Sequence, residues 1–278
     1  MGLRALSVMD YHDRFLRVAG ELGVPQDEAA RFAGLIRFRI RAGREPGGVR
    51  VGRFGGLPPL SEQVPLTFMA SLDCAALPRV AGFVLPEAGT LLFYLLAAAA
   101  VEACSIADEQ RFARIVHVPA RPVAGGGPGV DLFARVEADL PNWLDGPESR
   151  RSEFQKHVTR DMPHGAELVA LVDRLWPGRQ PWIGEDFVLG GYSVSAQDSP
   201  ETRLAEQASG GSEPYLPPGP ERLYRMEEKE FRVMGDWVPL AQFSVPCQAY
   251  IKGRFLIRHD DLAAGHFDKA LSFCEFTE

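Results

Sequence analysis

The chain has 278 residues, of which 46% are hydrophobic and 24% charged, and its formal net charge is −7. Such a chain can bury a sizeable core, which excludes wholesale disorder. The acidic balance argues against nucleic acid as the main partner, because phosphate binding needs a clustered basic surface. One basic run, RFRIRAGR from Arg37 to Arg44, keeps anion binding open as a minor alternative to a solvated helix end.

Cysteine spacing and hydropathy indicate the cellular compartment of the protein. The four cysteines stand far apart without a C-x-x-C spacing, so the usual zinc-ribbon and redox motifs are absent. The longest apolar run, residues 91–101, is shorter than the roughly 20 residues of a membrane span, and no secretory signal is present. We expect a cytoplasmic protein with free thiols and no membrane partner. No motif in the sequence identifies a cofactor, so the cofactor is left as unknown.

Two helices are predicted at the N-terminus. Asp10 is the expected N-cap of the first helix, which ends at Gly23. Pro25 opens the second helix, which places Arg41 and Arg44 at its C-terminal end. Its expected buried stripe consists of apolar residues at helical spacing, Phe32, Leu35, Ile36 and Ile40. We therefore expect residues 1–48 to form a helical extension ahead of a domain that covers residues 49–278.

The rest of the chain predicts a mixture dominated by strands. Apolar or alternating runs predict strands at residues 49–54, 66–72, 90–96, 112–118, 130–136 and within 186–197. Helical periodicity appears at residues 152–157 and 164–176. Residues 209–220 are rich in Gly, Ser and Pro and predict an exposed loop, with a lid over a site as the alternative.

Two segments, residues 65–95 and 237–276, look like copies of one unit. Each has an apolar strand with a small residue at its centre, Ala70 or Ala241. A glycine, Gly89 or Gly253, then opens a second apolar strand. A duplicated hairpin-like unit explains this pattern. The predicted fold class is therefore α+β and β-rich, with two similar halves from an internal duplication packed together, after an N-terminal helical pair.

Several short motifs, in their order, resemble the YwqG-like family, also called the DUF1963 domain. They are GGLP at 55–58, residues 66–78 and 85–94, LGGY at 189–192 with Gln197, and then Trp237, residues 240–242 and 253–267. The resemblance covers roughly residues 50–276 and implies a β-rich α+β fold of two similar halves. It implies no activity and no cofactor. The sequence departs from the family pattern at Ser71, where the first repeat usually has Gln.

Amide and aromatic side chains are the candidate ligand-binding residues. Gln242 and Gln197 are neutral amides in apolar surroundings, where an unpaired polar group costs about 1–3 kcal/mol. They either hydrogen-bond to the backbone across the halves or reach a ligand in a cleft between them. Trp237, Tyr192 and Tyr250 would wall such a cleft.

An acidic and histidine-bearing segment is the candidate catalytic site. His259, Asp260, Asp261, His266 and Asp268 lie close together in the sequence. Imidazole and carboxylate groups suit a divalent metal or general acid–base catalysis. The alternative is structural, with Asp260 or Asp261 as the N-cap of a helix and the remaining groups solvated.

We expect a binding or interaction protein that takes a small molecule, a peptide or a protein in the cleft between two pseudo-symmetric halves. The alternative is an enzyme, a metal-dependent or acid–base hydrolase or cyclase. In that case His259, Asp261 and His266 are catalytic and residues 209–220 form the lid.

Overall fold

The computed structural model describes residues 8–58, 64–80, 82–119, 127–179, 186–194, 198–209 and 217–277. The strands are β1 (Arg37–Gly43), β2 (Val49–Gly55), β3 (Phe68–Asp73), β4 (Thr90–Leu95), β5 (Ala113–Val118), β6 (Gly129–Asp139), β7 (Phe187–Gly190), β8 (Trp237–Val245), β9 (Gln248–Arg258) and β10 (Leu271–Phe276). The α-helices are α1 (Val8–Glu21), α2 (Gln26–Ala33), α3 (Ala97–Val101), α4 (Ile106–Glu109), α5 (Glu153–Thr159), α6 (Gly165–Leu175), α7 (Pro200–Ser209), α8 (Pro220–Asp236) and α9 (His259–Ala263). Short 3-10 turns are η1 (Gln110–Phe112), η2 (Asn142–Leu144), η3 (Glu148–Arg150) and η4 (Phe267–Lys269).

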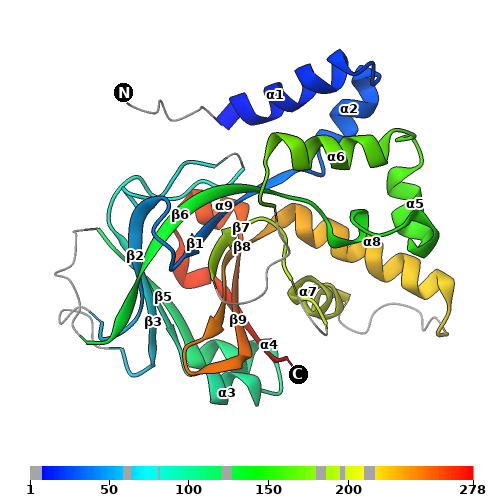
Figure 1. Ribbon diagram of the computed structural model, residues 1–278. Helices are drawn as coiled ribbons and strands as arrows, with labels where there is room; N and C mark the ends of the chain where they lie inside the picture. The colour runs from blue at the N-terminus through cyan, green and yellow to red at the C-terminus, as the bar shows by residue number, and fades with distance from the viewer. Residues whose placement is uncertain are drawn as a thin grey trace, which may run out of the picture.

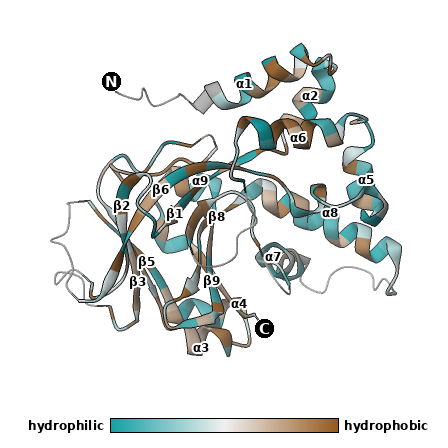
Figure 2. Cartoon of the chain, viewed as in Figure 1, coloured by the Kyte–Doolittle hydropathy of each residue, from teal (hydrophilic) through white to brown (hydrophobic). Residues whose placement is uncertain are grey.

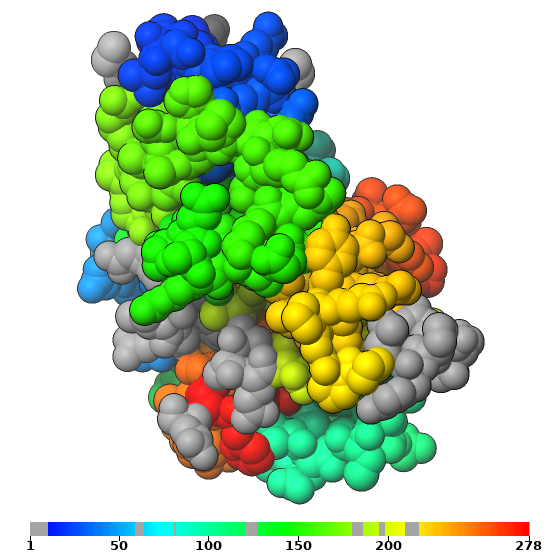
Figure 3. Space-filling model, turned by 90° about the vertical axis from the view of Figure 1, so that its right-hand side faces the viewer, coloured from blue at the N-terminus to red at the C-terminus, as the bar shows by residue number. Residues whose placement is uncertain are grey.

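One antiparallel sheet dominates the molecule, with strand order β10-β9-β8-β7-β1-β6-β2-β3-β4-β5. The sheet curls until it nearly closes into a barrel, and α5, α6 and α8 lie to one side of it (Figure 1). The blue N-terminal helices and the α3–α4 segment lie at opposite poles of the molecule (Figure 3). The prediction of a β-rich mixed fold with N-terminal helices is confirmed. Within the described residues, every helix is too short or too polar to span a bilayer.

Aromatic rings fill the inside of the barrel. Five buried phenylalanines come from five strands: Phe54, Phe93, Phe187, Phe243 and Phe255. Phe187 stacks on Phe243 at 5.1 Å between ring centroids, and Phe93 meets Phe255 at 5.8 Å. Since alternate residues of a strand face the same side, these rings mark the inner face of the sheet. Packed rings therefore fill the inside of the barrel.

Gly253 takes a different place in its strand from the one that the sequence predicted. It lies in the middle of β9 rather than at the opening of a strand. A Cβ atom at Gly253 would lie 2.9 Å from Leu95 Cδ2 and 3.0 Å from the Phe243 ring. Close packing across the barrel, not a turn, therefore accounts for this glycine.

The N-terminal helices differ from the prediction at two ends. Asp10 lies inside α1, which begins at Val8, so its expected role as the N-cap is wrong. Gly23 follows the end of α1 with φ +83°, as expected of a helix stop. The second helix, α2, starts after Pro25 as expected but already ends at Ala33.

Residues 37–43 were expected to end a helix, but they form β1, which pairs with β6 and β7 at the centre of the sheet. The alternation of Arg with an apolar residue there has the period of a strand. It puts Phe38, Ile40 and Ala42 into the core, whereas the expected helical stripe shares only Ile40 with this set. The boundary at residue 48 stays a prediction, but β1 is part of the sheet.

Two helices on the outer face of the sheet, α7 and α8, were not predicted. Figure 2 shows mainly hydrophilic residues along both, and α8 has no buried residue. Ion pairs at i, i+4 spacing support α8, such as Arg225–Glu221 at 3.1 Å. Of the expected 209–220 loop, residues 210–216 lie outside the described part of the chain.

Candidate functional site

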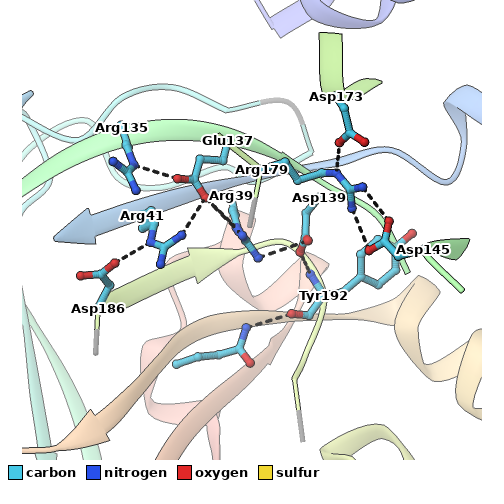
Figure 4. A network of polar contacts seen from close by, with 11 residues as sticks. Arg39, Arg41, Arg135, Glu137, Asp139, Asp145, Asp173, Arg179, Asp186 and Tyr192 are labelled. Atoms are coloured by element: carbon cyan, nitrogen blue, oxygen red, sulfur yellow. Dashed lines mark hydrogen bonds and ion pairs between the residues drawn. The ribbon is translucent and has the colours of Figure 1, made fainter. Parts of the chain in front are cut away.

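The outer face of β1 and β6 carries a buried network of charges (Figure 4). Arg39 lies 3.2 Å from Glu137 Oε2 through Nη2 and 3.2 Å from Asp139 Oδ1 through Nη1. Next to it, the Arg41 Nε donates to Asp186 Oδ2. Burial raises the pKa of Asp139, and the Arg39 charge opposes that rise. The alternation of β1 thus places a row of arginines outside the barrel, opposite its apolar residues.

A double-glycine turn connects this network to the end of β7. Gly190 and Gly191 both have positive φ, +73° and +75°, and the turn lets the Tyr192 N–H donate to Asp139 Oδ2 at 2.8 Å. A Cβ at Gly191 would lie 2.5 Å from that same carboxylate oxygen. Glycine is therefore required at position 191 both by the backbone conformation and by space.

Gln242 hydrogen-bonds to the backbone of residues 192–194, which follow the turn. Its Nε2 donates to the Tyr192 carbonyl at 2.9 Å, and its Oε1 accepts from the Val194 N–H at 3.0 Å. The amide is 1% exposed, and both ends of it are satisfied by backbone. Tyr192 in turn donates its hydroxyl to the Leu35 carbonyl at 2.9 Å, and burial raises its pKa to about 12. The structure thus brings Gln242 and Tyr192 together in a supporting position.

Replacing Gln242 with leucine should lower the free energy of unfolding by about 2 kcal/mol, because the Tyr192 carbonyl and the Val194 N–H lose their partner. Chemical denaturation of both proteins measures the difference. Gln248→Leu is the matched control, since Gln248 also lies on a strand but its side chain makes no hydrogen bond within the described residues. Equal losses in the two variants would contradict the proposed support by Gln242.

Arg37, the first arginine of β1, is held by backbone carbonyls and an aromatic ring. Its Nη1 donates to the Gly191 carbonyl at 3.1 Å and its Nη2 to the Met234 carbonyl. The guanidinium lies 4.3 Å above the centre of the Tyr192 ring. Within the described residues no carboxylate forms an ion pair with Arg37, whereas Arg39 and Arg41 are both paired. Burial raises the pKa of the Asp139 and Glu201 carboxylates, and the Arg37 charge opposes that rise from a distance, but Arg37 forms no direct ion pair with either.

Arg37 opens into a pocket of about 250 Å³ at the end of the barrel where β7 and β9 end and β1 and β8 begin. We call it the Arg37 pocket. Its walls are mostly apolar, from Ile36, Phe38, Phe83 and Val238. This volume lies just below the roughly 300–1,000 Å³ of pockets for drug-sized ligands. A ligand that fits would therefore be small.

Two histidines complete the polar part of the Arg37 pocket, and no Asp or Glu among the described residues lines it. His12, from α1, lies edge-on to the Phe38 ring at 5.6 Å. His259, the first residue of α9, makes no hydrogen bond through its ring within the described residues. Burial lowers the pKa of His259, and the nearby Arg37 charge lowers it further. This imidazole is therefore neutral at neutral pH.

The other expected ligand-binding residues lie elsewhere. Trp237 begins β8 and carries the Arg258 guanidinium 5.6 Å above its ring. Tyr250, on β9, is 53% exposed and stacks on Phe276 at 6.2 Å. Gln197 lies outside the described residues.

The expected catalytic segment divides into two parts. Asp261 accepts from Lys269 Nζ at 2.8 Å and lies 3.4 Å from His266 Nδ1, in an exposed cluster. This hydrogen bond from Lys269 lowers the pKa of Asp261. His259 instead lines the Arg37 pocket. In the described part of the chain, no three His, Cys, Asp or Glu side chains converge in a way that would hold a metal ion.

The capping role expected for Asp260 or Asp261 is wrong. The N-cap of α9 is Arg258, so both aspartates stand in the first turn of the helix. There they face the positive end of the helix dipole, which is a favourable place for a carboxylate.

A family model for DUF1963, a domain of unknown function, matches residues 53–275. The match spans most of the chain. The protein belongs to the DUF1963 family. No curated protein matches it. The Arg37 pocket draws His12 and Arg37 from the residues before the DUF1963 region, and Phe83, Val238 and His259 from within it.

Sequence reasoning missed His12, and it kept anion binding by the basic run from Arg37 to Arg44 open only as a minor alternative to a helix end. The alternation of Arg37, Arg39 and Arg41 with apolar residues was the available signal, since it predicts a strand with one basic face. His12 has no such signal, because its position beside Phe38 depends on how α1 packs on the sheet.

Proposed function

We propose that the protein binds a small organic anion in the Arg37 pocket. The observation that carries this proposal is an apolar pocket whose ionisable lining consists of His12, Arg37 and His259 alone, among the described residues. Apolar walls favour an apolar ligand body, and the nitrogen-bearing groups favour a negative head group. The proposal specifies the ligand class, which the sequence left open. It also places the binding site at the end of the barrel and not between two halves.

Arg37 is suited to a carboxylate. A guanidinium has five N–H donors in a planar fork, and the Gly191 and Met234 carbonyls occupy only part of them. Contact with the Tyr192 ring fixes the plane of the fork, so little further side-chain entropy is lost on binding. A carboxylate on the open side would give Arg37 a direct ion pair, which it lacks among the described residues.

His259 makes the affinity depend on pH. Its pKa lies below the ordinary 6.5, so the ring is neutral at neutral pH and gains a proton only in more acidic solution. A bound anion favours the protonated ring, because opposite charges attract in a partly desolvated pocket. The affinity for an anion should therefore rise as the pH falls below about 6.5 and level off above it.

The residues expected to bind the ligand keep a role here as positioning residues. Tyr192 lies beneath Arg37, and Gln242 holds the Tyr192 backbone. Neither is proposed to touch the ligand. Contacts from Trp237, Tyr250 or Gln197 stay predictions. A cytoplasmic location is also a proposal, supported by the free thiols of Cys74, Cys104, Cys247 and Cys274.

Benzoate is a suitable probe, because it has an apolar ring and one carboxylate. We expect it to bind more tightly than neutral benzamide, and Arg37→Gln should weaken benzoate binding by about 10–100-fold, the value of a hydrogen bond to a charged group. Ligand-observed NMR titration measures both affinities. Equal affinity for benzoate and benzamide would contradict the proposal.

Two further variants keep this test decisive if Arg37→Gln disturbs the fold. Arg258→Gln removes another ring-stacked arginine that does not line the pocket, and should leave benzoate binding unchanged. His259→Ala removes a ring that has no hydrogen-bond partner among the described residues. It should reduce the gain in affinity between about pH 8 and about pH 5.5 while leaving the affinity at the higher pH nearly unchanged.

The enzyme alternative has one supporting observation. His259 is a neutral imidazole in a pocket, which is the form that acts as a general base. An acid–base reaction there would need only His259 of the three expected catalytic residues. Asp261 and His266 would then take no part in it and would stay in their contact with Lys269.

We further propose that the two ends of the sheet arose by duplication. A β-bulge precedes Ala70 in β3 and Ala241 in β8. The strand partners of these alanines are Phe93 and Phe255, whose rings meet inside the barrel. In both halves a hairpin then leads through short helices to an edge strand, β5 or β10. Shared bulge position, shared ring position and shared order of elements support a common origin.

A further inference from the structure

The two edge strands of the sheet, β10 and β5, differ in whether their outward backbone groups have hydrogen-bond partners. On β10, the side chain of Gln110 accepts from the Ser272 N–H at 2.7 Å and donates to the Ser272 carbonyl at 3.2 Å. The Glu109 carboxylate also takes a backbone hydrogen bond from Cys274. Side chains of the α4–η1 connection thus occupy the outward backbone groups of β10. This edge is closed to a further strand.

The backbone of β5 has an open edge. The Leu96 N–H donates to the Phe112 carbonyl at 2.7 Å, which sets the phase of the antiparallel β4–β5 ladder. Since bonded pairs alternate, Arg114, Val116 and Val118 bond to β4. The N–H and carbonyl groups of the residues between them, Ala113, Ile115 and His117, therefore point to the free edge. Within the described residues no backbone group bonds to these three on that side.

A groove of about 440 Å³ runs along this open edge. One wall is β5 from Ala113 to His117, and the other is the segment from Gly265 to Leu271, which includes η4. The Phe267 ring contacts the His117 ring at 5.5 Å. We call this space the β5 groove. The second-half connection of residues 259–270 is shorter than the first-half connection of residues 96–112, which covers β10.

We propose that the β5 groove binds an extended peptide segment of a partner protein, which adds a strand to β5. Outward donors and acceptors at every second residue match the backbone of an extended chain. The groove supplies walls for its side chains. Arg114 is exposed and forms no ion pair within the described residues, so an acidic side chain beside it would complete the contact. This site is independent of the Arg37 pocket.

A displayed library of random heptapeptides is the probe, selected on the immobilised full chain. We expect enriched peptides with an acidic residue, and we expect His117→Pro to weaken their binding by about tenfold or more, because proline removes an outward donor and fills the edge. His117→Ala is the control, since it removes the same ring contacts but keeps the N–H. No enrichment, or equal binding to His117→Pro, would overturn the proposal.

The direction of the backbone groups is tested without any peptide. The melting temperature of His117→Pro should be close to that of His117→Ala, whereas that of Val116→Pro should be clearly lower. Of these two residues, only Val116 donates its N–H to β4. Amide hydrogen exchange should be fast at Ala113, Ile115 and His117 and slow at Arg114 and Val116. The reverse order of protection would overturn the assignment of the open edge and the groove proposal with it.

Discussion

Replacing Arg39 with methionine should lower the free energy of unfolding by about 3–5 kcal/mol, because among the described residues it removes the one ion pair of the buried Asp139 and leaves Glu137 with only Arg41 and Arg135. Glu137 and Asp139 both lie 3.2 Å from the Arg39 guanidinium, and all three side chains are at most 8% exposed. Urea denaturation of the wild type and the variant measures the loss. The loss should shrink as the pH falls, because protonated carboxyl groups no longer need a counter-charge.

The matched control is Arg50→Met. Arg50 also pairs with an aspartate across neighbouring strands, at 2.8 Å from Asp131, but the two side chains are 53% and 47% exposed. Solvent screens such a pair, so this variant should lose less than about 1 kcal/mol. If the two variants lost the same stability, the network on the outer face of β1 would not be a buried charge cluster.

Replacing Gly191 with alanine should cost about 2–5 kcal/mol, from two separate causes. A non-glycine residue at φ +75° costs about 1–2 kcal/mol in strain. The new Cβ would also lie 2.5 Å from Asp139 Oδ2 and 3.1 Å from Arg39 Cβ, and such overpacking costs about 1–3 kcal/mol. Thermal and urea denaturation measure the sum. Benzoate binding should weaken as well, since the Gly191 carbonyl holds Arg37.

Gly265→Ala separates the two causes. Gly265 has nearly the same backbone conformation, φ +73°, but a Cβ there would meet nothing within 4 Å. It should lose only the strain, about 1–2 kcal/mol. Equal losses at positions 191 and 265 would show that contact with Asp139 and Arg39 adds nothing.

The strands of the two sheet ends could be predicted because short apolar runs between glycines and prolines leave few alternatives. The runs at residues 90–96 and 112–118 correspond to β4 and β5. β1 could not be assigned in the same way, because Phe32, Ile36 and Ile40 fit a helical stripe while Phe38, Ile40 and Ala42 fit a strand. Pairing with β6 and β7, two strands that lie far away in the sequence, selects the strand over the helix.

The candidate site was less accessible to sequence reasoning than the fold. The sequence predicted a buried amide at Gln242 that either hydrogen-bonds to the backbone or reaches a ligand. Its contacts with Tyr192 and Val194 support the first of these roles. The closeness of His259, Asp261 and His266 in the sequence suggested one cluster. In the structure His259 lines the pocket with Arg37, whereas Asp261 contacts Lys269 and His266 away from that pocket. Side-chain direction on a short helix depends on its exact start, which sequence patterns locate poorly.

The most direct test of the proposed function is a crystal structure with 4-bromobenzoate, located by the anomalous scattering of bromine. We expect one anomalous peak within the Arg37 pocket, among Phe38, Phe83 and Val238, with the carboxylate turned toward Arg37 and His259. Fully occupied crystals of Arg37→Gln should lack that peak. A peak elsewhere on the molecule, or an empty Arg37 pocket at saturating 4-bromobenzoate, would contradict the proposal that this DUF1963 protein binds an organic anion there.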